Sequence, residues 1–149
     1  MDHFTQPISS TQDPYLDSLN CVDRLYREYL KYKKLFVAVD FDDTIYDFHN
    51  KGYTYPKLID LVKRCQKLGF YITIFTGNPK EKFDFIREYC HNIGIKVDSI
   101  NENPIPMPIG NSGKIYYNIL LDDRAGLYSA YQELLSVVEK AESNVGNKQ

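Results

Sequence analysis

The sequence predicts an α/β fold, a three-layer, Rossmann-like arrangement in which helices flank a parallel sheet of about four strands. Three observations support this prediction. Short apolar runs occur at residues 35–39, 70–75 and 118–121, and each has the length of a buried strand. Segments with apolar residues at helical spacing separate these runs. Strands that alternate with helices indicate right-handed crossovers and a ligand-binding edge at the carboxyl ends of the strands.

The N-terminal region is expected to hold one helix. Residues 1–12 are polar and unpatterned, so we expect an N-terminal extension. Asp13 has the character of an N-cap and Pro14 that of a first helical residue, which predicts a helix over residues 13–33. Its apolar positions recur at helical spacing, namely Leu16, Leu19, Val22, Tyr26, Tyr29 and Leu30.

The first strand-helix-strand unit follows directly. Residues 35–39 form an unbroken apolar run that ends on Asp40, as expected for a central strand covered on both faces. A helix is predicted from Pro56 to Gly69, because glycine is typical of the position just after a helix. Residues 70–75 then have the apolar character of a second buried strand.

The next unit predicts a third helix and an edge strand. Residues 78–81 read Asn-Pro-Lys-Glu, which matches a cap, a first-turn proline and a capping-box glutamate. This helix should end near Gly94 and bury Phe83, Ile86 and Cys90. Residues 95–100 alternate apolar with polar side chains, which is typical of an edge strand.

The C-terminal part predicts a loop, a strand and a helix. Residues 101–113 are rich in proline and glycine and are predicted to be a loop. The strand at 118–121 closes the core, which we place over residues 35–141, and the tail 142–149 is expected to fray. The inward face of the last helix is predicted to carry Leu127, Tyr131, Leu134 and Val138.

The composition is that of one globular domain with nearly balanced charge. The chain has 149 residues, of which 43% are hydrophobic and 26% charged, so a single packed core is expected. Its 18 basic and 20 acidic residues are scattered, and no basic arm for nucleic acid stands out. The three cysteines have no CxxC spacing and are predicted to be buried free thiols. Without a signal sequence or a membrane-length apolar stretch, the protein is expected to be cytoplasmic and to have no membrane partner.

Polar side chains gather at the ends of three predicted strands. Residues 40–44 (Asp-Phe-Asp-Asp-Thr) follow the first strand, residues 76–78 (Thr-Gly-Asn) follow the second, and Asp122 and Asp123 follow the last. Because parallel strands end at one edge, these groups should converge. Crowded carboxylates repel one another unless a hard cation neutralises them, and oxygen ligands suit Mg²⁺. The sequence therefore predicts magnesium and a phosphorylated substrate.

The pair Asp40 and Asp42 fits a phosphoryl-transfer mechanism. Asp40 is the candidate nucleophile that attacks phosphorus, and Asp42 is the candidate acid and base. A turn at Phe41 would aim both carboxylates at the substrate and point backbone N–H groups at the phosphate, with Thr44 holding the turn. An ordinary turn or helix cap is the competing interpretation of this segment.

Other polar residues are expected to bind the phosphate. Thr76 offers a hydroxyl, Gly77 permits close approach, and a helix that opens after Asn78 would present N–H groups and a positive dipole end. Helix capping explains the same residues equally well. Lys114 lies eight residues before Asp122 and is predicted to place its ammonium on the phosphate; a solvated surface lysine is the alternative.

These four segments, in this order, resemble the four motifs of the haloacid dehalogenase (HAD) superfamily, and the resemblance covers roughly residues 35–128. It implies that Asp40 is the nucleophile and a magnesium ligand. It also implies that Asp42 is the acid and base and contacts the metal through its carbonyl. Thr76 corresponds to the second motif.

The last two motifs complete the site that the resemblance implies. Lys114 corresponds to the third motif, and Lys80 and Arg87 are weaker substitutes for it. Asp122 and Asp123 correspond to the fourth motif, whose acids complete the magnesium site; which of the two binds the metal directly stays open.

Members of this superfamily often carry a cap domain that selects the substrate, and this chain has no room for one. Only 36 positions separate Asp40 from Thr76, and 38 separate Thr76 from Lys114. The resemblance is therefore to small capless phosphatases, whose open site implies a large substrate or a second copy of the chain that closes the site. The flap at residues 45–55 and the loop 101–113 would contact the substrate.

The expected function is magnesium-dependent hydrolysis of a phosphomonoester through an aspartyl-phosphate. The substrate is a small molecule, a glycan, a protein or a polynucleotide end. Two alternatives stay open: a binding or regulatory module of the same fold with little turnover, and a phosphotransferase.

Overall fold

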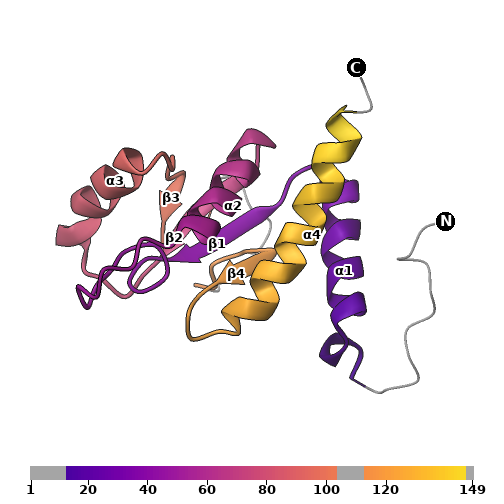
Figure 1. The fold of residues 1–149 in the computed structure, drawn as a ribbon, viewed down its shortest axis with the longest axis horizontal. Coiled ribbons are helices and arrows are strands. Elements are labelled where there is room, and N and C mark those ends of the chain that lie inside the picture. Colours follow the sequence, from indigo (N-terminus) through magenta and orange to yellow (C-terminus); the bar gives the residue numbers. More distant parts are fainter. Residues whose placement is uncertain (1–12, 104–112, 147–149) are drawn as a thin grey trace.

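The computed structural model describes residues 13–103 and 113–146. Within them an all-parallel sheet of four strands is flanked by four helices, which confirms the predicted α/β, Rossmann-like fold (Figure 1). The strand order is β3-β2-β1-β4. The strands are β1 (Phe36–Asp40), β2 (Tyr71–Phe75), β3 (Ser99–Ile100) and β4 (Ile119–Leu121).

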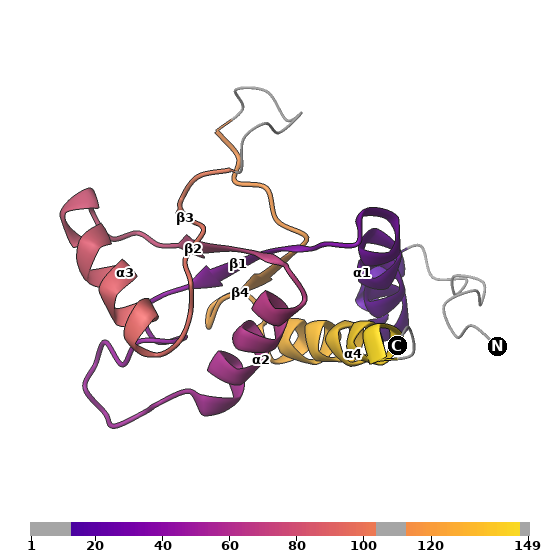
Figure 2. The ribbon, with the colours of Figure 1, turned by 90° about the horizontal axis from the view of Figure 1, so that it is seen from above.

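The helices are α1 (Ser18–Tyr32), α2 (Pro56–Lys67), α3 (Phe83–Asn92) and α4 (Leu127–Gly146). Figure 2 shows α2 and α4 on the same side of the sheet, with α1 beside α4. Two short 3-10 helices, Pro14–Leu16 and Lys80–Lys82, precede α1 and α3. No helix in the described part of the chain is long and apolar enough to cross a bilayer.

The core lies between the central strands and the inner faces of the helices. Val37, Ala38 and Val39 of β1 are fully buried, as the unbroken apolar run predicts for a central strand. Helices α2 and α4 cover the sheet with aliphatic side chains at helical spacing, including Leu61 and Leu134. Cys65 and Cys90 are buried free thiols, as predicted, whereas Cys21 is only partly buried.

Helix α1 begins later than predicted. The chain first forms a 3-10 turn, and α1 starts at Ser18 because the Asp17 carboxylate accepts a hydrogen bond from the Leu19 N–H (2.8 Å). Asp13 therefore does not cap this helix. The predicted apolar stripe is also wrong at three positions, since Leu16, Leu19 and Leu30 are exposed.

Helix α3 and strand β3 are shorter than predicted. Residues 78–81 do not form a capping box; α3 begins at Phe83 without a side-chain cap, because the Asn78 side chain bonds elsewhere. Ile95 lies beyond the end of α3, and its N–H donates to the Cys90 carbonyl of that helix (2.8 Å). Only Ser99 and Ile100 pair with β2, at the edge of the sheet as expected.

The C-terminal tail is more ordered than predicted over residues 142–146. Helix α4 continues to Gly146, and Glu142 accepts two hydrogen bonds from Arg64 of α2, at 2.7 and 3.0 Å. This bidentate pair ties the last turns of α4 to α2. The predicted extension 1–12, most of the loop 101–113 and residues 147–149 lie outside the described residues.

Candidate active site

Three of the predicted strand ends meet at one edge of the sheet. In the β1–β2 register Asp40 lies beside Phe75, and in the β1–β4 register Val39 lies beside Leu121. Asp40, Thr76 and Asp122 therefore leave neighbouring strands at the same level. Parallel pairing brings together residues that are up to 82 positions apart in the sequence.

The turn after β1 is closed by its own backbone. The Phe41 carbonyl accepts hydrogen bonds from the N–H groups of Ile45 (3.1 Å) and Tyr46 (3.0 Å), and Asp43 adopts a left-handed conformation with φ of 61°. Asp43 in turn donates its N–H to the Tyr46 carbonyl (2.7 Å). The N–H groups of Asp43, Ile45 and Tyr46 therefore hold the loop together.

Thr44 joins the turn to the end of β4. Its side chain is fully buried, and its hydroxyl lies 3.0 Å from Asp40 Oδ2 and 3.2 Å from Asp123 Oδ1. The hydroxyl also accepts a hydrogen bond from the Asp123 N–H (3.2 Å). Thr44 therefore holds the turn, as predicted, and also fixes the positions of two carboxylates relative to each other.

Asp40, Asp122 and Asp123 form an acidic cluster that fits a hard cation. One carboxylate oxygen from each lies within 4.8 Å of the others. Burial raises the pKa of Asp40 to about 7, and its hydrogen bond with Asp123 and the charge of Asp122 act in the same direction. The three carboxylates are close enough together to hold one metal ion. The Asp42 carboxylate is not part of this cluster.

The raised pKa of Asp40 predicts a stability that depends on pH and magnesium. The folded protein keeps a proton on Asp40 up to pH about 7, whereas the unfolded chain releases it near pH 3.8. The stability contributed by this group is therefore lost as the pH rises through that window. In EDTA, we expect the unfolding temperature of wild type to fall relative to that of Asp40→Asn between these pH values.

Magnesium should reverse this loss, because a cation that binds the folded state stabilises it. Thermal unfolding of both proteins, with EDTA and with MgCl₂, measures the effect. Because the two proteins share every other titrating group, the difference between their unfolding temperatures reports on residue 40. If the difference in unfolding temperature between the two proteins in EDTA did not change with pH, the prediction from the raised pKa of Asp40 would be wrong.

A polar chain connects β2 to Asp42. Asn78 donates its side-chain N–H to Asp42 Oδ2 (3.0 Å) and to the Thr76 hydroxyl (2.8 Å). Asn78 thus orients the proposed acid and base. A Cβ on Gly77 would meet no described atom within 4 Å, so the site is open there. Because α3 starts only at Phe83, the predicted helix N-terminus does not follow Asn78 directly.

Asn101, which the sequence analysis did not single out, holds Thr76 in place. Its side chain accepts the Thr76 N–H (2.8 Å) and donates to the Thr76 carbonyl (2.7 Å). It adopts a left-handed conformation, φ of 55°, directly after β3. Asp40 was identified because it is a polar residue directly after a predicted strand. Asn101 directly follows the strand predicted over residues 95–100, so the same signal could have identified it.

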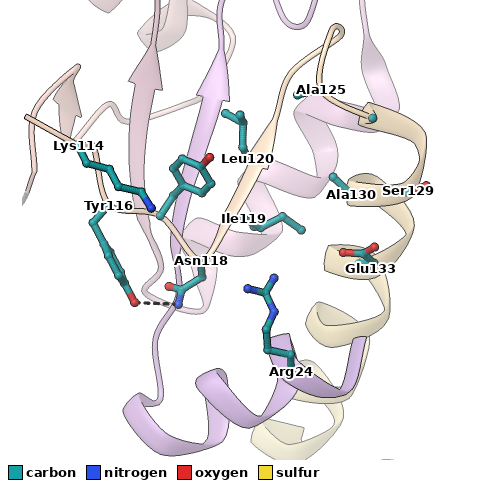
Figure 3. Close-up of a pocket in the computed structure, with 12 residues that line it drawn as sticks. Arg24, Lys114, Tyr116, Asn118, Ile119, Leu120, Ala125, Ser129, Ala130 and Glu133 are labelled. Carbon is teal, nitrogen blue, oxygen red and sulfur yellow. Dashed lines mark hydrogen bonds between the residues drawn. The ribbon is translucent and has the colours of Figure 1, made fainter. Parts of the chain in front are cut away.

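The structure does not bring Lys114 into the acidic cavity. Lys114 lines a separate cavity of about 490 Å³ along β4, on the opposite side from Glu133 of α4 (Figure 3). The reason lies in Asn103, which donates to the Lys114 carbonyl (2.9 Å) and accepts the Tyr116 N–H. These bonds hold the backbone of this segment next to Asn103. The predicted lysine contact to the phosphate stays a prediction, and Lys114 is not among the residues that line the acidic cavity.

The acidic cluster opens into a cavity of about 310 Å³. Asp42, His49 and Arg124 line it together with the cluster. His49 Nδ1 lies 3.0 Å from Asp43 Oδ2, and the His49 side chain is exposed. Arg124 was not among the predicted site residues, although it directly follows Asp123 in the sequence. The cavity therefore combines five carboxylates, those of the four predicted acids and of Asp43, with one guanidinium that sequence reasoning missed.

Comparison with known proteins supports the fold. No family model and no curated protein matches this chain. The chain is similar to the solved structure of a conserved protein coded by a locus from Bacteroides thetaiotaomicron, with 25% sequence identity and a TM-score of 0.52. The match covers 61% of this chain and 77% of that protein. That protein is described only as conserved, so the likeness carries no activity to this chain.

Proposed function

We propose that this protein is a magnesium-dependent phosphomonoester hydrolase of the HAD type that acts through an aspartyl-phosphate on Asp40. The observation that carries the proposal is the convergence of Asp40 and Asp42 on one cavity with Asp122 and Asp123. A structural turn or a helix cap would explain the acidic residues at either strand end taken alone. It does not explain why carboxylates from both strand ends crowd together at a place where burial, and then the neighbouring acids, raise the pKa of Asp40.

The two proposed steps need one nucleophile and one proton carrier. First, an Asp40 oxygen attacks phosphorus, the bond from phosphorus to the ester oxygen breaks, and that oxygen takes a proton from Asp42. Then water attacks phosphorus and gives a proton to Asp42, while the bond between phosphorus and Asp40 breaks. Phosphate and an alcohol are the products, and both carboxyl groups return to their starting states.

The metal would be held by Asp40 and the acids after β4. Asp122 and Asp123 bring two further carboxylates within reach of one ion. When bound, magnesium neutralises the charge on the transferring phosphoryl group and favours the ionised form of Asp40. Asp42 stays outside the cluster because Asn78 holds its carboxylate. This separation supports different roles for the two aspartates, nucleophile and proton carrier.

The proposed hydrolysis takes place in an open site, because no cap domain lies between Asp40 and Thr76. The stretch from Asp40 to Thr76 is described in full and contains only the flap, α2 and β2. Specificity must then come from the flap, from neighbouring side chains or from a second copy of the chain.

A panel of phosphomonoesters, assayed for released phosphate with MgCl₂ and with EDTA, tests the proposal. Magnesium-dependent turnover on at least one substrate supports it. Tight binding of phosphorylated ligands without turnover would replace the hydrolase by a binding module. Transfer of phosphate to an acceptor alcohol in preference to water would identify a phosphotransferase.

A second prediction compares the effects of Arg124→Ala and Lys114→Ala on kcat/KM. Arg124 lines the acidic cavity and Lys114 lines the cavity along β4. We expect Arg124→Ala to lower kcat/KM about tenfold, the effect of one lost charge-assisted hydrogen bond to phosphate. Lys114→Ala should change it less than about threefold, as for a residue outside the site. The reverse order would return the phosphate contact to Lys114.

A further inference from the structure

A second cavity, also of about 310 Å³, adjoins the acidic cavity. The two cavities share Asp42 and Phe48 as lining residues. Four of the eight residues that line the second cavity are aromatic, namely Phe41, Tyr46, Phe48 and Phe85, and Lys82 adds a positive charge. We call it the aromatic cavity.

The aromatic walls are built from the turn after β1 and from α3. Phe41 and Tyr46 stack with ring centroids 4.9 Å apart, and Phe85 meets the Tyr46 ring edge-on at 5.5 Å. Phe85 also meets Phe41 edge-on at 6.3 Å, so its ring is held from two sides. These contacts give the cavity a defined apolar wall.

Two of these rings are exposed although they lie beside the proposed chemistry. Phe85 is 44% exposed and Phe48, on the flap, is 58% exposed. Exposed phenylalanine surface is unfavourable in water, and two such rings in one concave wall are typical of a ligand site. A ligand that covered them would gain the free energy of burying that surface.

We propose that the aromatic cavity binds the leaving group of the substrate, and that this group is a ring with a flat apolar face. This inference rests on the proposed function. Asp42 must reach the ester oxygen to protonate it, and Asp42 lies on the boundary of both cavities. With the phosphoryl group beside Asp40, the alcohol part of the substrate extends into the aromatic cavity.

The size and polarity of the cavity narrow the substrate class. Its volume is at the lower end of the range for small-molecule sites, which fits one ring. Lys82 supplies a hydrogen-bond donor beside the aromatic walls. Sugar rings and aromatic rings both present flat apolar faces, and both fit this chemistry.

Steady-state kinetics on four phosphomonoesters tests the inference. Phenyl phosphate and glucose 6-phosphate carry rings, whereas ethyl phosphate and glycerol 3-phosphate do not. We expect Phe85→Ala and Phe48→Ala each to lower the ratio of kcat/KM for ring over acyclic substrates about fivefold. Tyr32→Ala, an equally exposed ring at the far end of α1, should leave the ratio unchanged.

The outcomes separate this inference from the function on which it rests. If the two phenylalanine variants lose kcat/KM only for phenyl phosphate, the leaving group is aromatic. If they lose kcat/KM for glucose 6-phosphate, the leaving group is a sugar. Equal loss on ring and acyclic substrates, with turnover that still requires Asp40, overturns the subsite and leaves the hydrolase in place. No turnover by wild type on any substrate overturns both. Thermal unfolding checks that the Phe48 variant, whose ring is exposed, keeps the wild-type fold.

Discussion

Asp40→Asn is expected to abolish magnesium-dependent phosphate release, with kcat reduced on the order of 10⁴-fold or more. The amide keeps the size of the carboxylate but cannot attack phosphorus as an anion. Thr44 still finds a hydrogen-bond acceptor on the Asn oxygen, so the turn after β1 should persist. The assay follows released phosphate from the best substrate of the panel, with MgCl₂ in excess.

A folding defect must be separated from a chemical one in this variant. Asp40 adds charge to a crowded acidic cluster, so Asp40→Asn without metal at pH 8 should unfold at the same temperature as wild type or higher. Asp84→Asn, which neutralises an exposed carboxylate on α3, is the matched control and should keep wild-type activity. Activity of Asp40→Asn near the wild-type level would refute the aspartyl-phosphate mechanism.

Asp42→Asn is expected to lower kcat by about 10²- to 10⁴-fold, the usual contribution of a general acid and base. The loss should depend on the leaving group. Ethyl phosphate needs a proton on its departing oxygen, so its first step should be slowed most. A nitrophenolate departs without that proton, so with 4-nitrophenyl phosphate the first step should survive and the hydrolysis of the aspartyl-phosphate should become limiting.

A burst experiment measures separately the first step and the hydrolysis of the aspartyl-phosphate. Asp42→Asn mixed with 4-nitrophenyl phosphate should release about one equivalent of nitrophenol quickly and then turn over slowly. Mass spectrometry should find the phosphate on Asp40. Asp60→Asn, an exposed carboxylate on α2, should behave as wild type. If Asp42→Asn lost activity equally on all substrates and showed no burst, Asp42 would have a structural role through Asn78.

Much of the fold follows from local patterns in the sequence. The apolar run before Asp40 and the run at residues 70–75 predict buried parallel strands, and β1 and β2 lie there. Pro56 and Gly69 bracket α2 as predicted. These patterns are reliable because burial on both faces of a strand demands apolar side chains at every position.

Other boundaries depended on competition between neighbouring residues. Asp13 and Asp17 both have a side chain suited to a helix cap, and only the hydrogen bond from the Leu19 N–H shows which one caps α1. Asn78 matches a capping box by spacing, yet its amide bonds to Asp42, 36 positions earlier. Local propensity cannot weigh a tertiary hydrogen bond against a cap, because the partner is distant in the sequence.

For the candidate site, the sequence by itself determined which acids stand at the ends of strands: Asp40, Asp42, Asp122 and Asp123. Only the tertiary structure decided how they divide, with Asp40, Asp122 and Asp123 in one cluster and Asp42 held apart by Asn78. The tertiary structure also separated Lys114 from this cavity and placed Arg124 in it. The physical reason is that the type of a residue fixes its chemistry, whereas the register of parallel strands and the hydrogen bonds between loops fix which residues meet.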